Sequence, residues 1–390
     1  TEIVWFYPAS MTQNRFNKFK AEWENTFATL FGAPISNIIA ASESVAPYYY
    51  HKAKKGATST VVSVDIGGGT TDVLIVDKGE PKYLTSFRFA ANTIFGDGYS
   101  YDSDSNGFVN KYKDIITNQL ETNNLRGLKT VLKSVLDKRV STDVIAFLFS
   151  LASNKEIKKE KVEINFAKML ADDNRGKYVV ILFYVAIVYH IAKLMKAKGF
   201  DMPRHMTFSG NGSKVLNILS TNDATLVRLT KIIFEEIYAQ SYSIDGLDII
   251  RPANSKESTC KGGIILTPFQ SQDYGEIKDM KTILIGTDNE KFADVHMTYN
   301  DVTEADLDSV VDVIKEYIEF TFKLDKKFSF YDNFDVDRSI MNKVKDLCYR
   351  DIRTYLENGL AIKKSEIAQD GADDNLEETL FFYPLVGIIN

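Results

Sequence analysis

Hydrophobic residues near the start of the chain fall into short runs separated by one longer periodic stretch. The runs EIVWFYP, NIIAAS and STVVSVDI are rich in β-branched and aromatic side chains, which predicts strands near residues 2–8, 37–42 and 59–66. Residues 12–31 place large apolar side chains at helical spacing, which predicts an amphipathic helix. A shorter helix is expected to begin within ESVAPYYYHKAKK.

The next stretch, TDVLIVDKGEPKYLTSFRF, predicts two further strands separated by the turn residues at 78–81. Residues 107–198 carry the helical period with few strand signals, and the strand-then-helix pattern resumes at HMTFSGNGSKVLNILS. Strands and helices mixed in this way indicate an α/β protein, with a mixed sheet covered by helices. The helical stretch is interpreted as an insertion into the sheet domain.

The C-terminal region gives weaker signals, although two helices are expected there. Thr303 followed by Asp306 is typical of a helix start, and a second helix is predicted at about 337–361. Leu307, Val310 and Ile314 share one face of the first helix. That face is either core or a docking surface for a partner, and the pattern does not distinguish the two.

One stretch, residues 178–195, is almost continuously apolar and resembles a membrane span. His190 and Lys193 interrupt it where a span of about 20 residues should finish. We therefore predict a buried helix and no contact with a membrane.

Composition narrows the classes of function. Of the 390 residues, 44% are hydrophobic and 26% are charged, as in ordinary globular proteins. The net charge of −6 gives no basic surplus for neutralising nucleic-acid phosphates. Cys260, Cys348 and the scattered histidines have no disulfide or zinc spacing, so a cytoplasmic location is expected.

The segment VVSVDIGGGTTDVLIV carries the most chemistry. Three glycines, Gly67, Gly68 and Gly69, join two strands and are followed by Thr70, Thr71 and Asp72. Glycines that turn their amides outward suit a polyphosphate. A strand follows the loop, whereas the Walker and Rossmann loops require a helix there.

Asp65 lies at the end of a buried strand, where a carboxylate is costly without a partner. A hydrated Mg²⁺ beside the phosphates would stabilise it, which predicts a metal site that contacts Asp65 through water. The alternative is an ordinary glycine-rich hairpin with solvated aspartates.

DIGGGTTD resembles the second phosphate motif of the actin-like ATPase superfamily, which includes the heat-shock chaperone ATPases and the bacterial actins. Other segments resemble the superfamily's motifs in the same order. They are VWFYPASMTQNRFNKFK and NIIAASESVAPYYY before the hairpin, then ANTIFGDGYSYD, MTFSGNGSKVLNIL and CKGGIIL after it. The resemblance covers about residues 1–270 and implies an actin-like ATPase (ribonuclease H-like) fold with ATP or ADP and Mg²⁺ as cofactors.

The resemblance also implies roles for individual residues. Glu43 falls on the glutamate that orients the attacking water, and Asp65 is its catalytic partner beside the metal. Gly210, Gly212, Ser213 and Lys214 fall on the adenosine motif. Without the resemblance, Glu43 is equally a helix-start glutamate favoured by the helix dipole, and the Gly210 segment is a common strand-to-helix turn.

The resemblance divides the chain into four regions. Residues 1–60 correspond to the remainder of the first lobe, and 61–106 with 199–270 to the sheet of the second lobe. Residues 107–198 form the inserted helical subdomain, and 271–390 a C-terminal extension with mixed structure and two helices. The superfamily's first phosphate motif, Asp-x-Gly-Thr, has no counterpart before Glu43. The chain is therefore interpreted as the later part of an ATPase, and the part alone is expected to be inactive.

Three functions fit these expectations. The first is an ATP-binding conformational switch, chaperone-like or cytoskeletal, whose C-terminal extension contacts a protein partner or a second copy. The second is a sugar or acid kinase of the same fold. The third is a degenerate scaffold that no longer hydrolyses ATP. The fold alone does not choose among them.

Overall fold

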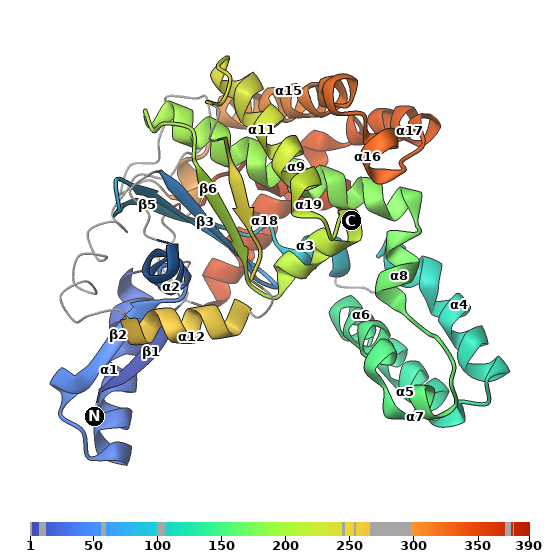
Figure 1. Ribbon diagram of the computed structural model, residues 1–390, viewed down its shortest axis with the longest axis horizontal. Coiled ribbons are helices and arrows are strands. Elements are labelled where there is room, and N and C mark those ends of the chain that lie inside the picture. The colour runs from blue at the N-terminus through green and yellow to red at the C-terminus, as the bar shows by residue number, and fades with distance from the viewer. Residues whose placement is uncertain are drawn as a thin grey trace.

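The computed structural model describes residues 2–7, 13–55, 60–99, 106–243, 246–252, 255–265, 298–370, 376 and 378–390. A central sheet is covered by helices on both faces, and a group of helices projects from one end (Figure 1). The α/β class predicted from the sequence is confirmed. The expected boundary at residue 271 lies outside the described residues.

The N-terminal region contains a two-stranded sheet that is separate from the main sheet. Strands β1 (Ile3–Tyr7) and β2 (Ile38–Ser42) pair in parallel, and helix α1 (Gln13–Phe31) lies against them. Trp5 stacks on Trp23 of α1 at a ring-centroid distance of 6.3 Å. The predicted strands and helix are therefore confirmed, with ends one or two residues shorter.

The main sheet has the strand order β5-β4-β3-β6-β7. Its strands are β3 (Val61–Ile66), β4 (Thr71–Asp77), β5 (Glu80–Phe87), β6 (His205–Ser209) and β7 (Asp248–Ile250). The first three form an antiparallel meander, whereas β6 and β7 run parallel to β3. The short strand β7 was not predicted. A meander followed by parallel strands is the mixed sheet expected of the ribonuclease H-like fold.

Successive side chains along β3 and β4 point to opposite faces of the sheet and pack in two separate hydrophobic clusters. Val62, Val64 and Val73 face α9 (Asn174–Ala197) and α11 (Asp223–Tyr238) in the large core. Val61 and Leu74 point to the opposite face, where they meet α2 (Ala46–Lys55). Because both faces are covered, β3 and β4 are apolar almost throughout, as the sequence shows.

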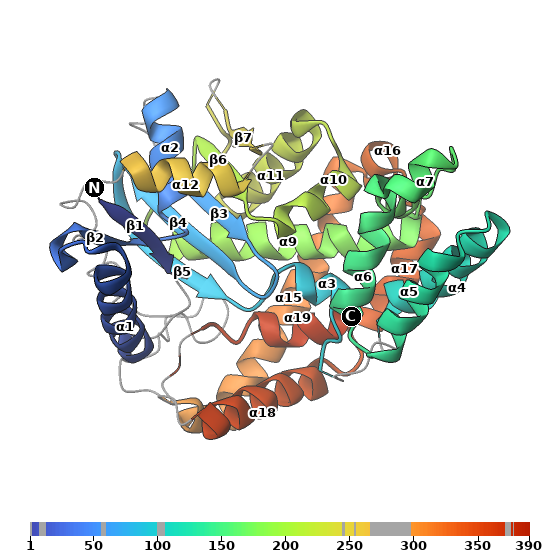
Figure 2. The same ribbon diagram turned by 90° about the horizontal axis from the view of Figure 1, so that it is seen from below.

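The predicted helical stretch between the sheet strands consists of helices joined by turns, with no strand among the residues described for it. It contains α4 (Gly107–Thr122), α5 (Arg126–Asp137), α6 (Ser141–Ser150), α7 (Lys155–Lys159) and α8 (Phe166–Ala171) before the long helix α9. In Figure 2 these helices project from one side of the sheet, opposite α1, β1 and β2. Helix α9 is different, because it runs beneath the sheet as part of the core.

Within the described residues, α9 is the one helix long and apolar enough to cross a membrane, but 89% of its apolar window is buried inside the protein. The predicted buried helix is therefore confirmed.

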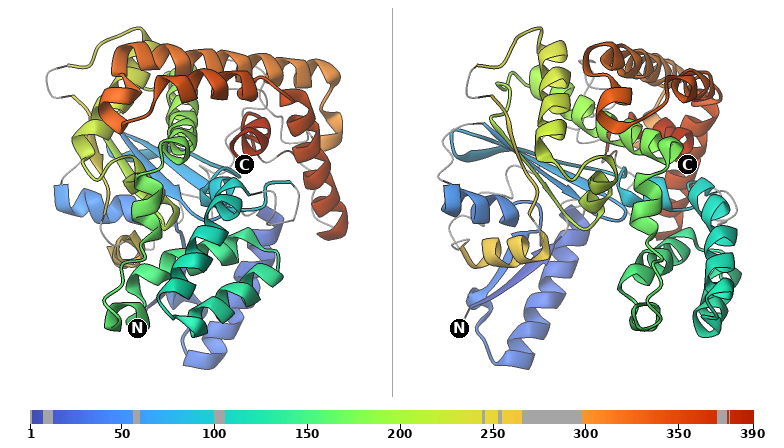
Figure 3. Two further views of the ribbon diagram at one scale, coloured as in Figure 1. Left: turned by 90° about the vertical axis from the view of Figure 1, so that its right-hand side faces the viewer. Right: turned by 45° about the vertical axis from the view of Figure 1, so that its right-hand side comes forward.

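The C-terminal region is more helical than predicted. It contains α15 (Glu304–Phe328), α16 (Phe330–Phe334), α17 (Arg338–Cys348), α18 (Ile352–Asp370) and α19 (Phe382–Ile389). The Thr303–Asp306 capping box is present at the start of α15. The prediction of one helix at 337–361 is wrong, because the chain breaks near Asp351, whose φ of 57° is left-handed. Figure 3 shows α15 and α17 crossing the top of the molecule, and α19 lying beside the sheet.

His190 of α9 gives the fold a testable dependence on pH. Its ring is 2% exposed and lies 4.8 Å from the Phe382 ring and 5.5 Å from the Phe381 ring. Burial lowers the pKa of His190 from 6.5 to about 3. Below pH 6.5 the unfolded chain therefore binds a proton that the folded chain does not, and stability falls as the pH falls.

We expect His190→Phe to remove this contribution. Between about pH 7 and about pH 5, the unfolding free energy of the original chain should fall by roughly 2 kcal/mol more than that of the variant. Urea unfolding at the two pH values measures the difference. Equal losses in the two proteins would show that His190 is not buried in its neutral form.

Candidate functional site

Four polar residues stand side by side across four strands of the main sheet. Ser86 is paired with Asp72, Asp72 with Asp65, and Asp65 with Ser209. Paired residues share a face of the sheet, so the four form one row. The row crosses the carboxyl ends of β3 and β6, where ligands bind in open α/β sheets.

Asp72 is the anchor of this row. Its side chain is buried, with the residue 3% exposed, and it accepts hydrogen bonds from two hydroxyl groups. Ser86 Oγ donates to Oδ1 from within the sheet, and Ser44 Oγ donates to Oδ2 at 2.8 Å from the turn after β2. Asp72 therefore ties the base of the hairpin to the N-terminal region.

The hydrogen bond between Ser44 and Asp72 also fixes the position of the neighbouring residue, Glu43. The residue is partly buried, and its backbone amide donates to Tyr7 O at 3.1 Å, which closes the end of the β1–β2 pair. Since the adjacent Ser44 contacts Asp72, Glu43 is held next to the polar row. The structure thus holds the backbone of Glu43 near the hairpin, and its role toward the attacking water stays a prediction.

The tip of the β3–β4 hairpin is exposed at Gly68 and Gly69. Two of its carbonyl groups are occupied, because the amides of Ala91 and Asn92, at the start of α3 (Ala91–Phe95), donate to Gly67 O and Gly68 O. Gly67 N donates to Thr70 O at 2.9 Å. The amides of Gly68, Gly69 and Thr70 donate to no acceptor in the described part of the chain. Successive unpaired amides at an exposed turn are typical of anion sites.

Backbone strain does not explain the glycines at the tip. Gly67, Gly68 and Gly69 all have φ outside the left-handed region. A methyl group on Gly69 would meet nothing within 4 Å, and one on Gly68 would meet only the Asn92 side chain, at 3.6 Å. The protein itself leaves room for side chains at these two positions. The absence of side chains there suits a ligand that approaches the backbone closely.

The second glycine loop lies directly against the first. A methyl group on Gly212 would collide with the carbonyl oxygen of Gly67, and one on Gly210 with the Asp65 carboxylate and Ile66 O. Gly210 also has a left-handed φ of 81°. Both loops, predicted separately from sequence, therefore form one surface. Ser213 Oγ donates to Gly210 O at 2.8 Å, and the Lys214 side chain is exposed at the rim.

Asp65 is the residue that could hold a metal through water. Its Oδ2 accepts a hydrogen bond from Ser209 Oγ at 3.2 Å, and the side chain is partly exposed beside the tip. No group of three or more His, Cys, Asp or Glu residues in the described ranges could bind a metal directly. A single carboxylate such as Asp65 could contact a hydrated Mg²⁺ only through its waters, and this metal site stays a prediction.

The remaining predicted residues lie at the base of the hairpin. Thr71 is fully buried and its hydroxyl donates to Phe89 O at 2.6 Å, so it contributes to folding the hairpin. Sequence reasoning missed Ser44, Ser86 and Ser209, which hold the carboxylates. Only Ser209 had a usable signal, since it directly precedes the predicted Gly210 loop.

The mixed sheet, its strand order and the adjoining Gly210 loop agree with the actin-like ATPase fold that the sequence resembles. No protein-family model matches the chain, and no curated protein does.

Several solved structures are similar to parts of the chain at low identity. Ethanolamine utilization protein EutJ from Carboxydothermus hydrogenoformans is 13% identical, with 68% of this chain and 65% of EutJ covered and a TM-score of 0.28. MreB5 of Spiroplasma citri, bound to ADP, is 14% identical, with 70% of each chain covered and a TM-score of 0.27. Component A of (R)-2-hydroxyglutaryl-CoA dehydratase from Acidaminococcus fermentans is 13% identical, with 64% and 73% covered and a TM-score of 0.26. Likeness at this level transfers no ligand or activity to this chain.

The contact between the two loops predicts opposite outcomes for two glycine-to-alanine changes. Gly212→Ala should destabilise the protein by about 1–3 kcal/mol, because the added methyl group forces the hairpin backbone away. Gly69→Ala is the matched control and should change stability by less than about 0.5 kcal/mol, since its methyl group enters open space. Urea unfolding measures both. Equal effects would contradict the close approach of the loops.

Proposed function

We propose that this chain binds the phosphates of ATP or ADP and acts as the nucleotide-dependent switch of an actin-like ATPase. The observation that supports this most directly is the hairpin tip, where the amides of Gly68, Gly69 and Thr70 donate to no acceptor in the described part of the chain. Such amides carry partial positive charge and can bind phosphate oxygens without basic side chains. This agrees with a chain whose net charge is −6.

The neighbours of the tip fit the rest of a nucleotide. Asp65 lies where a Mg²⁺ between the phosphates could be held through its waters. The loop from Gly210 to Lys214 adjoins the same tip, as expected of a surface beneath the adenosine. When bound, Mg²⁺ would offset the charge of the phosphates. We assign Glu43 the orientation of the attacking water, because Ser44 holds its turn against the hairpin.

A conformational output is favoured because the hairpin is connected to other regions. Asp72 joins it to the N-terminal region through Ser44, and Asn92 joins it to α3. A ligand that binds one arrangement of the tip more tightly will favour the matching arrangement of both neighbours. A cytoplasmic location and a chaperone-like or filament-forming role complete the proposal.

Gly69→Asp tests the phosphate site. The new carboxylate would face the anion from a position that tolerates a side chain, so the dissociation constant of Mg-ADP should rise on the order of tenfold or more. Gly127→Asp is the control, because Gly127 is exposed in the first turn of α5 and has only one neighbouring atom within 4 Å. Isothermal titration calorimetry gives both constants. The proposal fails if the unmodified protein binds no nucleotide, or if folded Gly69→Asp binds it as well as the control.

A further inference from the structure

A cavity of about 360 Å³ lies beside Gly69, between the hairpin tip and the C-terminal helices. Its wall on the hairpin side is the segment after β5, which includes Arg88 and Tyr99. The opposite wall, the α18 wall, contributes Gly359 and Glu366, and residues of α19 complete it. Gly69 therefore shares one cavity with side chains of both walls.

The α18 wall packs directly on the segment after the hairpin. A methyl group on Gly359 would come within 2.6 Å of the Tyr99 hydroxyl oxygen, so no side chain fits between them. The Tyr99 hydroxyl in turn donates to Tyr383 O of α19. Both C-terminal helices are thus in contact with the hairpin side of the cavity.

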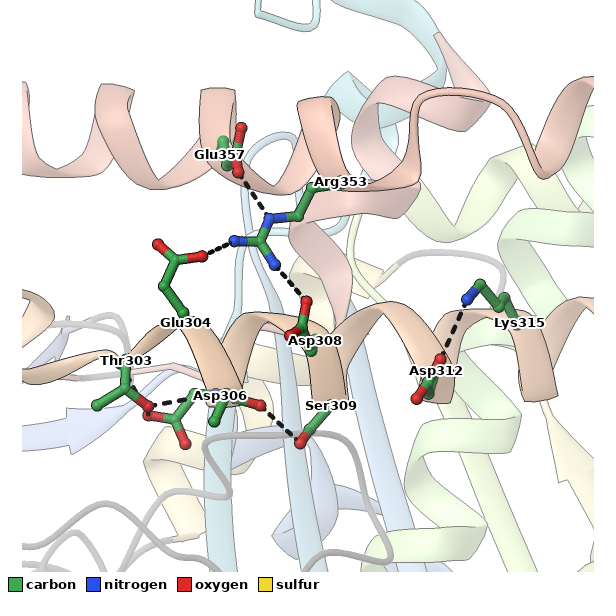
Figure 4. A network of polar contacts seen from close by, with 10 residues as sticks. Thr303, Glu304, Asp306, Asp308, Ser309, Asp312, Lys315, Arg353 and Glu357 are labelled. Atoms are coloured by element: carbon green, nitrogen blue, oxygen red, sulfur yellow. Dashed lines mark hydrogen bonds and ion pairs between the residues drawn. The ribbon is translucent and has the colours of Figure 1, made fainter.

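The same helix is fixed to α15 at its other end. Figure 4 shows Arg353 of α18 directed at carboxylates of both helices. It donates to Asp308 at 2.8 Å, to Glu357 at 2.6 Å and to Glu304. Several carboxylates on one guanidinium make a network, which orients α18 better than an isolated surface pair would. Glu366 of this helix is therefore presented to the cavity from a fixed backbone.

Arg88 is the arginine that the sheet places next to the hairpin tip. It directly follows Phe87, the last residue of β5, and Phe87 is paired with Thr71, the first residue after the tip. The backbone amide of Arg88 donates to the Glu378 carboxylate at 2.8 Å, which anchors the main chain at this point. The side chain is 45% exposed and lines the same cavity as Gly69.

The guanidinium of Arg88 is shared between two carboxylates that differ in burial. Glu378 is 5% exposed, lies 3.7 Å from Nε, and also accepts from the Tyr383 hydroxyl at 3.0 Å. The Glu366 side chain is 41% exposed and accepts from Nη1. Nη2 donates to no acceptor within the described ranges. Glu378 is thus part of the packed wall, whereas Glu366 is a partner that another anion could replace.

A phosphate would compete well for this guanidinium. An ion pair between exposed side chains is weak, because both charges are well hydrated when apart. Arginine binds a phosphate through two parallel N–H donors, and Nη2 together with Nη1 offers such a pair once Glu366 no longer holds Nη1. Since Arg88 and Gly69 line one cavity, the tip amides and the guanidinium could bind the same phosphate chain.

We propose that Arg88 binds the phosphate chain of a nucleotide held at the hairpin tip, and that Glu366 of the C-terminal region regulates this site by competing for the Arg88 guanidinium. The inference rests on the proposed function, since both use the amides of the tip. It adds a cation from the segment after β5 and gives an inhibitory role to a region that the motif resemblance does not cover. By reciprocity, any event that draws Glu366 away from Arg88 tightens phosphate binding.

Isothermal titration calorimetry with Mg-ADP tests the inference. Arg88→Met removes the guanidinium and keeps an aliphatic side chain, and it should raise the dissociation constant on the order of tenfold or more. Glu366→Gln keeps the size of the side chain and removes the competing charge, so it should lower the constant by about threefold or more. Glu357→Gln is the matched control, since Glu357 is another exposed carboxylate of α18 paired with an arginine. It should leave the constant within about twofold of the original value.

A double variant, Arg88→Met with Glu366→Gln, separates competition from direct repulsion between Glu366 and the phosphates. If Glu366 acts through Arg88, its replacement should change the constant by less than about twofold once Arg88 is gone. The same threefold gain in the Arg88→Met background would show that Glu366 only repels the ligand, which would overturn the competition.

The remaining outcomes separate the inference from the proposed function. Mg-ADP binding that is unchanged in Arg88→Met or in Glu366→Gln overturns the inference and leaves the proposed function standing. Equal effects of Glu366→Gln and Glu357→Gln also overturn it, because they would reflect the orientation of α18. If Arg88→Met does not fold, the comparison of these two glutamine variants, both at exposed side chains, still decides. An original chain that binds no Mg-ADP removes the proposed function and the inference together.

Discussion

The buried carboxylate of Asp72 is the interaction on which the site depends. It lies at the base of the glycine hairpin and accepts hydroxyl hydrogen bonds from Ser44 and Ser86, which belong to different parts of the chain. Burying a carboxylate is costly unless such bonds replace its water. Each hydrogen bond to a charged group contributes about 1.5–3 kcal/mol, so the N-terminal region and β5 are both held to the hairpin by one side chain. The geometry of the tip follows from this fixed base.

The polar row bears on the proposed Mg²⁺ as well as on the proposed phosphates. Asp65 and Asp72 are directly paired across β3 and β4, and like charges in such positions destabilise a sheet. The hydroxyl groups of Ser44, Ser86 and Ser209 offset part of that repulsion. The amides at the tip favour anions a few residues away. A phosphate chain with a hydrated Mg²⁺ would complement both groups at once, which a simple anion would not.

Much of this arrangement was predictable from local sequence patterns, but the supporting contacts were not. Consecutive glycines between two apolar runs predict the hairpin, and Thr303 with Asp306 predicts the start of α15.

The partner of Asp72 across β4 and β5 depends on a bulge. If the β4–β5 pairing continued from the Asp77–Glu80 pair without a shift in register, Thr85 would lie opposite Asp72. The register shifts near Pro81, which has no amide to donate, and brings Ser86 there instead. The Ser44 contact and the α18 wall join segments distant in the chain, and no local pattern encodes them.

The hairpin tip is connected on two sides, and this bears on how a nucleotide could act at a distance. On one side, Asp72 and Ser44 lead to Glu43 and the N-terminal region. On the other, Gly68 O accepts from Asn92 of α3, and the segment leading into that helix carries Arg88, which pairs with Glu366 of α18. Packed cores and ion-pair networks shift between discrete arrangements more readily than they deform continuously. A small displacement of the tip would therefore have to be accommodated by both neighbours together. The C-terminal helices, which contact the segment after the hairpin directly, would respond to the same event as the turn that carries Glu43.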